Sequence, residues 1–283
     1  MLALGIDLAD VEVRGVAVDG DGTILRRGRG SRGRAGLRDL LDELSAGHRP
    51  DAIGLAADAP GAPLEGAARW PVALVCTPGA AAVVAESWLG GARGARHALC
   101  LLIGDRVIAG LLLNGEPWVG AHGFAGAAAW FALNPVERQD YRRFGNLAAE
   151  VSNEGIARRL AWRVQAGDES VVIERAGSLE AITALHVFDG ARAADGVAIS
   201  VVRETAKYIG MALANMASLL DPEIIVLGGT VAGARDLLLE PIRQECARRL
   251  PPGLVDQFRF AMSDLGPDVV AIGAARLAMH PAG

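Results

Sequence analysis

The chain has 283 residues, 51% of them hydrophobic and 22% charged, and a formal net charge of -5. These values are typical of a well-packed globular protein of two domains, and they exclude disorder over most of the length. The negative charge gives no general attraction for nucleic acid or for an anionic membrane, so we expect neither as a partner.

The cysteines and the apolar runs of the sequence indicate the cellular compartment of the protein. Cys76, Cys100 and Cys246 are odd in number and widely spaced, which favours buried thiols in a reducing cytosol. Asp7 and Asp10 interrupt the first apolar run, so it does not resemble a signal peptide. Asp105 and Arg106 likewise interrupt the run at 99–113, which argues against a membrane span. The sequence therefore predicts a cytoplasmic protein.

Apolar periodicity and turn residues predict the elements in chain order. The predicted strands are 2–8, 11–18, 22–25, 51–57, 72–76, two strands within 99–115, 223–227 and 258–262. The predicted helices are 37–44, 79–88, a region ending near 163, 194–220, 233–250 and 268–279. Since the first strand begins at the second residue, we expect no DNA-reading domain before it.

Two strand-turn-strand patterns, at 2–18 and 99–115, lie about 95 residues apart and end in Asp/Asn-Gly turns. They indicate an internal duplication, and so an α/β protein with two related halves and a cleft between them. We predict an N-terminal domain of residues 1–95 plus the helix at 268–283, and a second domain of residues 96–267.

Two glycine-containing segments allow more than one interpretation. Residues 26–38 are basic and rich in glycine, and a solvated loop entering a helix is favoured there over an anion-binding site because stacking aromatics are missing. Gly228 and Gly229 separate a buried strand from a helix, where a nucleotide could approach the backbone. Close packing explains the second pair equally well.

Three segments carry a family resemblance: GIDLADVEVRGVAVDGDGTIL at 5–25, IGDRVIAGLLLNGEPWVGAHGFAG at 103–126 and ETAKYIGMALANMASLLDPEIIVLGGTV at 204–231. They resemble the ROK family of bacterial sugar kinases and transcriptional repressors, within the actin-like/hexokinase ATPase superfamily. The resemblance implies a two-domain actin-like (ribonuclease H-like) fold with a cleft between duplicated halves. It also implies in-line phosphoryl transfer from ATP to a sugar, which needs a base, phosphate-binding amides and a magnesium ligand.

The positions that the resemblance assigns to this chemistry are degenerate. The Asn-Asp pair that supplies the family's base aligns with Thr77-Pro78, and proline cannot accept a proton. On the nucleotide side, the first phosphate loop keeps its acid but replaces glycines and a threonine, and the second keeps only its first and last glycines. The degenerate nucleotide-side positions are Asp7, Asp10, Gly104, Asp105, Gly110, Gly228 and Gly229.

The implied sugar and zinc positions have also changed. Ala127 and Trp130 stand where the family has a glutamate and a histidine, and Ala148 replaces a second glutamate, so the degenerate sugar side is Thr77, Ala127, Trp130 and Ala148. The last cysteine of the family's zinc segment is Asn146, and no cysteine lies between residues 100 and 246, which excludes that zinc site by ligand count.

These losses favour a catalytically inactive ROK-like protein, a pseudokinase that binds a ligand or a partner. The alternative is an ATP-dependent hexose kinase resembling a glucokinase, with a relocated carboxylate at Asp58 or Asp105. We expect no obligatory cofactor, with ATP and magnesium only if nucleotide binding is retained. The expected partners are a second copy in a homodimer or a paralogous kinase subunit, and a small sugar is the expected ligand.

Overall fold

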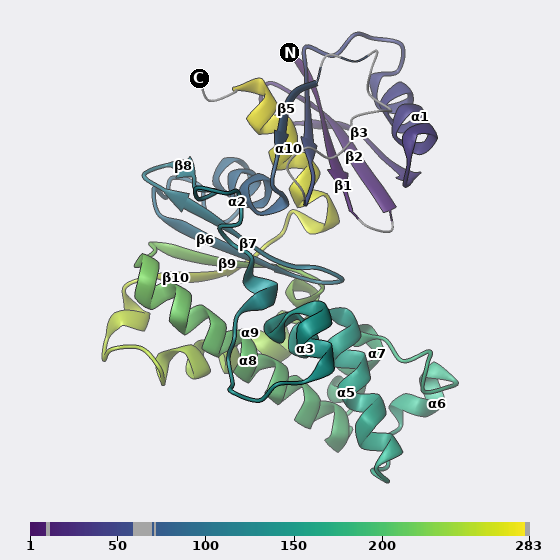
Figure 1. Cartoon of the computed structure of the whole chain (residues 1–283), viewed down its shortest axis with the longest axis vertical. Coiled ribbons are helices and arrows are strands. Elements are labelled where there is room, and N and C mark those ends of the chain that lie inside the picture. The colour runs from purple at the N-terminus through teal and green to yellow at the C-terminus, as the bar shows by residue number, and fades with distance from the viewer. Residues whose placement is uncertain (10–11, 59–69, 71, 281–283) are drawn as a thin grey trace. The chain divides into compact units, whose positions relative to one another are not determined.

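The computed structural model describes residues 1–9, 12–58, 70 and 72–280 (Figure 1). The strands are β1 (Leu2–Leu8), β2 (Glu12–Asp19), β3 (Ile24–Ser31), β4 (Ala52–Ala56), β5 (Val72–Cys76), β6 (Ala98–Ile103), β7 (Val107–Leu113), β8 (Glu116–Pro117), β9 (Ile224–Gly229) and β10 (Arg259–Met262). The α-helices are α1 (Arg34–Ser45), α2 (Pro78–Trp88), α3 (Gln139–Phe144), α4 (Asn146–Val151), α5 (Asn153–Gln165), α6 (Val172–Ala176), α7 (Ala184–Arg192), α8 (Gly196–Leu220), α9 (Arg235–Ala247) and α10 (Val269–Met279). Short 3-10 helices are η1 (Ala128–Trp130), η2 (Thr230–Ala234), η3 (Leu254–Asp256) and η4 (Gly266–Asp268).

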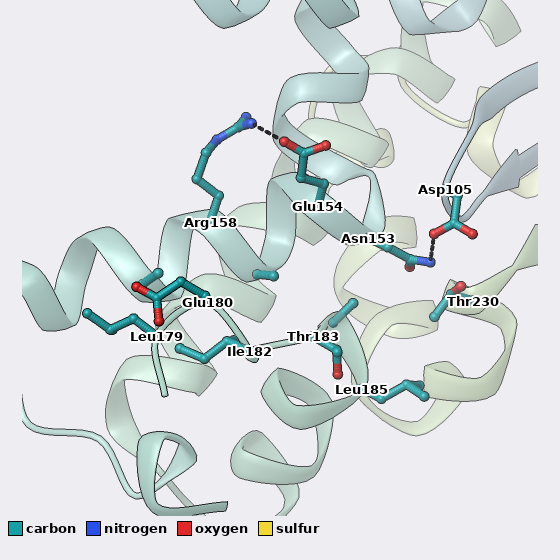
Figure 2. Close-up of a pocket in the computed structure, with 13 residues that line it drawn as sticks. Asp105, Asn153, Glu154, Arg158, Leu179, Glu180, Ile182, Thr183, Leu185 and Thr230 are labelled. Carbon is teal, nitrogen blue, oxygen red and sulfur yellow. Dashed lines mark hydrogen bonds and ion pairs between the residues drawn. The ribbon is translucent and has the colours of Figure 1, made fainter. Parts of the chain in front are cut away.

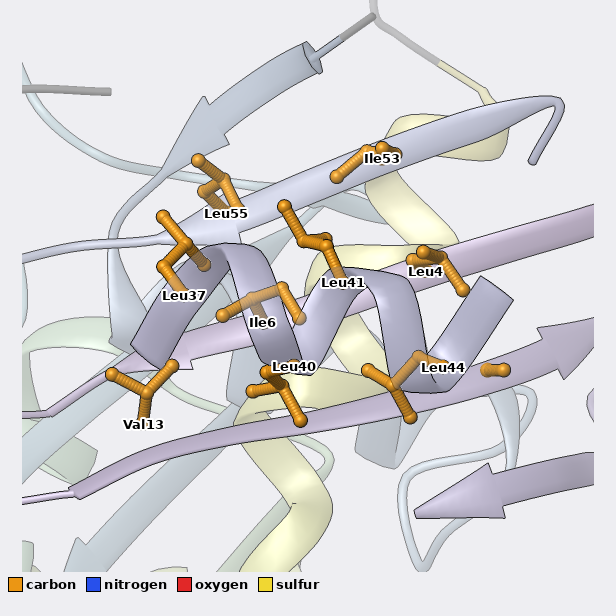
Figure 3. Packing of buried hydrophobic residues seen from close by; sticks show 10 residues of the cluster. Leu4, Ile6, Val13, Leu37, Leu40, Leu41, Leu44, Ile53 and Leu55 are labelled. Carbon is orange, nitrogen blue, oxygen red and sulfur yellow. The ribbon is translucent and has the colours of Figure 1, made fainter. Parts of the chain in front are cut away.

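The first sheet has the strand order β3-β2-β1-β4-β5. β1 is antiparallel to β2 and parallel to β4, and β4 is parallel to β5. The sheet therefore combines an antiparallel hairpin, β1–β2, with parallel strands on the other side of β1. Alternate residues of these strands form one apolar face, on which the leucines of α1 pack (Figure 3). The opposite face receives α10, where Gly5 and Gly54 are required: a Cβ on either would lie 1.9 or 2.0 Å from a carbonyl oxygen of α10.

The second sheet has the strand order β10-β9-β6-β7-β8. By backbone contacts the chain forms two compact units, one of residues 1–100, 109–126 and 263–283 and one of residues 101–108 and 127–262. The α/β fold class is confirmed, while the boundary near residue 95 stays a prediction. In the described part of the chain, no helix is long and apolar enough to cross a membrane.

The interpretation of residues 26–31 as a solvated loop is wrong, because they continue β3 to Ser31. Glycine and arginine alternate along this strand. A Cβ on Gly28 would lie 2.5 Å from Leu40, and one on Gly30 would lie 2.9 Å from a backbone oxygen of α1. The glycines therefore face α1, and Arg27 and Arg29 take the outer, solvated face. Arg26 lies on the inner side, where its Nε donates to the carbonyl of Leu44 in α1 at 2.7 Å.

Most predicted elements are present within a few residues of their expected ends, but α6 and α7 were missed. α7 begins at the capping threonine Thr183, whose hydroxyl accepts a hydrogen bond from the backbone N–H of His186 while His186 accepts one from Thr183. The predicted turn at Asp10 and the predicted loop at 60–71 lie largely outside the described residues.

Candidate functional site

The predicted catalytic position lies in the first turn of α2. Thr77 is the N-cap, and its hydroxyl accepts a hydrogen bond from the backbone N–H of Ala80 at 3.2 Å. Pro78 follows as the first helical residue, where its missing N–H costs nothing, and it is buried. This turn has no acidic residue. Helix capping therefore uses the polar atom that the sequence offers here.

Gly110, predicted on the nucleotide side, lies within β7 against α2. A Cβ on Gly110 would lie 2.0 Å from the carbonyl oxygen of Gly79, and one on Gly79 would lie 2.1 Å from that of Ala109. Gly126 adds a third close backbone contact, since its carbonyl accepts the N–H of Ala109 at 2.9 Å. Gly110 therefore serves close packing, and it lies outside the lining of the cavity described below.

Two acids of the first unit have different surroundings. Asp7 lies in β1 and is only 4% exposed. It is close to Cys76, whose thiol pKa is raised to about 12 by burial, with a further contribution from the charge of Asp7. Asp58 follows β4 and is exposed. Asp10, the remaining nucleotide-side acid of this unit, lies outside the described residues.

The sugar-side positions of the second unit lie on neighbouring elements. Ala127 caps η1 and Trp130 ends it, with the side chain of Trp130 59% exposed. Gly145, the residue before α4, packs closely against this segment, because a Cβ at position 145 would lie 2.3 Å from the carbonyl oxygen of Ala129. Ala148 is buried in α4. The structure thus brings these positions together, but without an ionisable side chain at any of them.

A cavity of about 540 Å³ opens in the second unit beside the β6–β7 turn (Figure 2). Its apolar wall comes from α5, α7 and the segment between α6 and α7. Its polar groups come from the β6–β7 turn, α5, η2 and the same segment before α7. The lining residues are Asp105, Asn153, Glu154, Ala157, Arg158, Ala161, Leu179, Glu180, Ile182, Thr183, Ala184, Leu185 and Thr230. This size is in the range of cavities that bind small molecules.

Two nucleotide-side segments predicted from the sequence meet at this cavity. Asp105 and Thr230 both line it, and Thr230 lies within van der Waals reach of a Cβ placed on Gly104. Asn153, which sequence reasoning missed, donates its backbone N–H to the carbonyl of Gly104 at 2.9 Å and its side-chain amide to Asp105 at 2.7 Å. These bonds fasten the β6–β7 turn to the start of α5.

Gly228 and Gly229 precede Thr230 without lining the cavity. Gly228 is buried in β9, and Gly229 has a φ of 78°, a conformation that favours glycine. A Cβ on Gly229 would lie 2.3 Å from the carbonyl oxygen of Ile103. Close packing therefore requires glycine at position 229, and a nucleotide at this turn stays a prediction.

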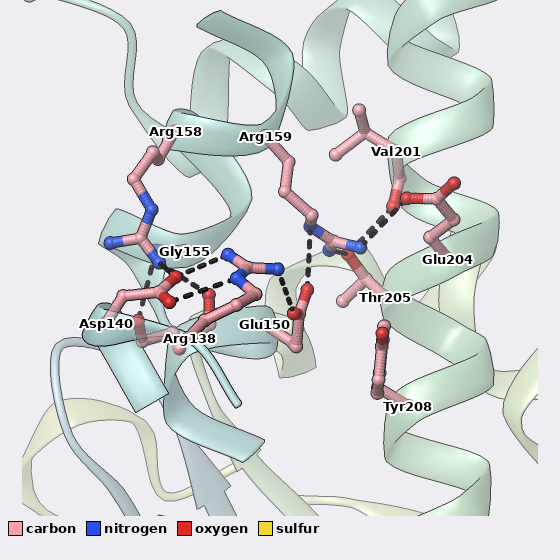
Figure 4. A network of polar contacts seen from close by, with 12 residues as sticks. Arg138, Asp140, Glu150, Gly155, Arg158, Arg159, Val201, Glu204, Thr205 and Tyr208 are labelled. Atoms are coloured by element: carbon pink, nitrogen blue, oxygen red, sulfur yellow. Dashed lines mark hydrogen bonds and ion pairs between the residues drawn. The ribbon is translucent and has the colours of Figure 1, made fainter. Parts of the chain in front are cut away.

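A buried network of charges fixes α5, which forms one wall of the cavity (Figure 4). Glu150, 2% exposed, accepts hydrogen bonds from Arg138 at 3.0 Å and from the hydroxyl of Tyr141, and its second oxygen lies 3.8 Å from Arg159 Nε. Burial, with the bond to Glu150, raises the pKa of Tyr141 to about 12. Arg159 on α5 also donates to Thr205 of α8. The network therefore ties α5 to α4 and α8.

Among the described residues, no group of three or more His, Cys, Asp or Glu side chains is arranged to hold a metal ion. Cys76, Cys100 and Cys246 are free thiols, and burial raises the pKa of each.

Comparison with known proteins identifies the family. The ROK family model matches residues 64–280. The chain is 32% identical over 269 residues to a glucokinase of Halalkalibacterium halodurans, covering 85% of this chain and 81% of the relative. Its fold is similar to that of a ROK family glucokinase from Streptomyces griseus, crystallised with glucose and AMPPNP, with a TM-score of 0.86, 24% identity and 99% of each chain covered. A ROK hexokinase from Thermus thermophilus matches with a TM-score of 0.78, 22% identity and 99% of each chain covered. The fold is thus the actin-like ATPase fold of these sugar kinases, and the chain belongs to the ROK family.

Proposed function

We propose that this chain is a non-phosphorylating member of the ROK family, a pseudokinase that works by binding a ligand or a partner protein. The start of α2 carries the proposal: the family resemblance aligns Pro78 with the family's base, and the hydroxyl of Thr77 is used as the helix cap. Loss of a general base typically costs on the order of a hundredfold to ten-thousandfold in rate.

The sugar-side positions support the same proposal. Ala127, Trp130 and Ala148 offer neither the carboxylates that orient sugar hydroxyls nor an imidazole. The hydroxyl that accepts a phosphoryl group would therefore lack the carboxylates that hold it in line with the phosphate.

The nucleotide-side residues do not fit a bound magnesium triphosphate. Asp105 places a carboxylate on the turn where the family's glycines would receive phosphate oxygens, and its Oδ1 is bonded to Asn153. A second carboxylate, Glu154, stands in the same cavity. Like charges repel a polyanion, so no step of the proposal runs through ATP.

The physiological role then depends on what the protein binds. A homodimer or a complex with an active paralogous kinase belongs to the proposal, with the exposed Trp130 at the altered surface. Arg159, at the other end of the region expected to carry that surface, is buried and does not contribute to it. A small sugar is a further candidate ligand. A cytoplasmic location, which suits three free thiols, is part of the same proposal. Light scattering and copurification from the native host test the oligomer and the partner.

The proposal is tested by a coupled assay of ADP release with magnesium ATP and a panel of glucose, other hexoses and N-acetylhexosamines. The glucokinase of Halalkalibacterium halodurans is the matched positive control, because it is 32% identical to this chain. We expect no sugar-dependent ADP release above the rate without protein. Release that depends on both the sugar and this chain would overturn the proposal.

A second candidate function is an ATP-dependent hexose kinase with a relocated acid, favoured by the identity to a glucokinase. Asp58 and Asp105 are its candidate carboxylates, and both are exposed. If this account holds, Asp58→Asn or Asp105→Asn lowers turnover by on the order of a hundredfold or more. Equal turnover in both variants and the unmodified chain would remove these two acids as bases.

A further inference from the structure

A second cavity, of about 380 Å³, lies between α5 and α8 within the second unit, and several of its lining residues are drawn in Figure 4. It shares no lining residue with the cavity at the β6–β7 turn, and it contains none of the predicted nucleotide-side or sugar-side positions. Most of its polar groups are cationic. The lining residues are Arg138, Glu150, Arg159, Trp162, Arg163, Val201, Glu204, Lys207 and Tyr208.

Lys207 contributes a positive charge that has no partner. It is the only lysine of the chain, its side chain is exposed, and its ammonium group forms no ion pair or hydrogen bond with any residue that the structure describes. Two other cations of the lining are paired with carboxylates that lie outside it. Arg138 donates to Asp140, and Arg163 donates to Asp168. Lys207 therefore leaves one positive charge uncompensated beside the cavity.

Arg159 contributes a second positive charge, and this one is buried. Its side chain is only 9% exposed, and its Nε donates no hydrogen bond to any described residue. The carboxylates beside it lie at 3.8 Å for Glu150 and 3.3 Å for Glu204. Burial lowers the pKa of this guanidinium, because the charged form loses its hydration. An anion held in the cavity would stabilise that charged form.

The balance of charges favours a ligand with a single negative charge. Glu150 and Glu204 also line the cavity, and they repel a dianion such as a phosphate monoester more strongly than a monoanion. A carboxylate pairs with Lys207 and leaves no further charge beside these two acids. Glu204, 53% exposed, and the hydroxyl of Tyr208 can form hydrogen bonds with hydroxyl groups of the same ligand, and Trp162 offers apolar surface.

We propose that the cavity between α5 and α8 binds a small hydroxylated monocarboxylate, whose carboxylate pairs with Lys207 close to the buried guanidinium of Arg159. This site is separate from the positions that the family resemblance assigns to the sugar and the nucleotide. The inference does not depend on the proposed function, because the cavity is the same in a chain that transfers phosphate and in one that does not.

The first test uses the single lysine as a local reporter. Acetylation of Lys207 in the full chain by an amine-reactive ester is followed by mass spectrometry at fixed ionic strength, with the α-amino group as the internal reference. The probes are gluconate, sorbitol and sorbitol 6-phosphate, three open-chain six-carbon compounds that carry one negative charge, none, and up to about two. We expect gluconate to slow acetylation of Lys207 saturably, by about threefold at twice its dissociation constant, since the bound fraction is protected. Sorbitol should protect neither amine.

Calorimetry on variants connects the binding to this charge. Lys207→Gln is expected to weaken gluconate binding by about fivefold, as for the loss of one partner of an exposed ion pair. Lys207→Arg keeps the charge and should stay within about twofold of the unmodified chain. Arg235→Gln is the matched control: it removes another exposed cation, at the start of α9, that lines neither cavity, and it should leave the affinity unchanged.

Four results would overturn the inference: no saturable protection of Lys207 by gluconate, equal protection by sorbitol, tighter binding of sorbitol 6-phosphate than of gluconate, or an unchanged affinity in Lys207→Gln. The protection experiment uses the unmodified chain, so it decides the inference even where a variant fails to fold. None of these outcomes alters the turnover assay, and a phosphorylated sugar product would overturn only the proposed function.

Discussion

Two helices begin at positions that the sequence assigns to the site, and their first turns differ in chemistry. α2 starts with a threonine cap followed by Pro78, and α5 starts with the cap Ser152 followed by Asn153. Both caps accept a backbone N–H three residues on, so both hydroxyls serve the helix. After the cap, α2 offers only buried apolar atoms, whereas α5 offers an amide bonded to Asp105 beside an open cavity. The first turn of α2 therefore has no acidic side chain, while the start of α5 places polar groups beside the cavity.

The largest expected effect comes from breaking the network that holds α5. Glu150→Ala leaves Arg138 and Arg159 without a shared partner, and one of these arginines is deeply buried. We expect the free energy of unfolding in urea to fall by about 3 kcal/mol or more. Glu137→Ala removes an exposed ion pair with Arg142 and should cost under about 1 kcal/mol. Equal losses in the two variants would contradict the structural role of Glu150.

A smaller loss of stability is expected on replacing Gly110, a glycine of the predicted phosphate loop that packs against α2. Gly110→Ala places a Cβ 2.0 Å from the carbonyl oxygen of Gly79, and overpacking of this kind costs about 1–3 kcal/mol. Gly196→Ala is the matched control, because no atom lies within 4 Å of its added Cβ. A normal melting temperature for Gly110→Ala would show that this glycine is not needed for packing.

Removing the caps tests whether the two helix starts are equivalent in stability. Thr77→Ala and Ser152→Ala each remove a side-chain acceptor, and each should lower the free energy of unfolding by about 1 kcal/mol. Thr77→Ser keeps the hydroxyl, so its free energy of unfolding should stay close to that of the unmodified chain. A Thr77→Ala variant as stable as the unmodified chain would show that its hydroxyl is free for another role.

The smallest expected effect is the ionisation of Tyr141. The chain has two tyrosines, so absorbance of the phenolate resolves them. Burial and the bond to Glu150 raise the pKa of Tyr141 to about 12, above the usual value of about 10. A raised folded pKa stabilises the protein fully below pH 10 and loses that contribution as pH rises toward 12. Both tyrosines titrating near pH 10 while the protein is folded would contradict this contact.

The fold was predictable from the sequence because its signals are local. Alternating apolar runs and Asp/Asn-Gly turns predict both hairpins, and β1 pairs with β2 from Leu2 opposite Asp19 to Leu8 opposite Val13. The strand character of residues 26–31 was missed because their composition is that of a loop. Their alternation of glycine and arginine has the period of a strand, but only the contact with α1 shows why the inner positions must be glycine.

The candidate site was predictable only in part. The sequence singles out Asp105 and the Gly228-Gly229 turn, and the structure brings Asp105 and Thr230, which follows that turn, into one cavity. Asn153 gives no local signal, since its role depends on a turn nearly fifty residues earlier in the chain. The apolar wall from the segment before α7 was missed for the same reason, because distant contacts create it.

The measurement that tests the central claim most directly is a single-turnover experiment with the protein in excess over ATP labelled on its terminal phosphate. Excess protein removes product release as a limit, so even slow phosphoryl transfer becomes visible. With Pro78 at the position of the base, we predict that no label reaches glucose or any other hexose within hours. Label on a sugar, lost when Asp58 or Asp105 is replaced by asparagine, would contradict the account.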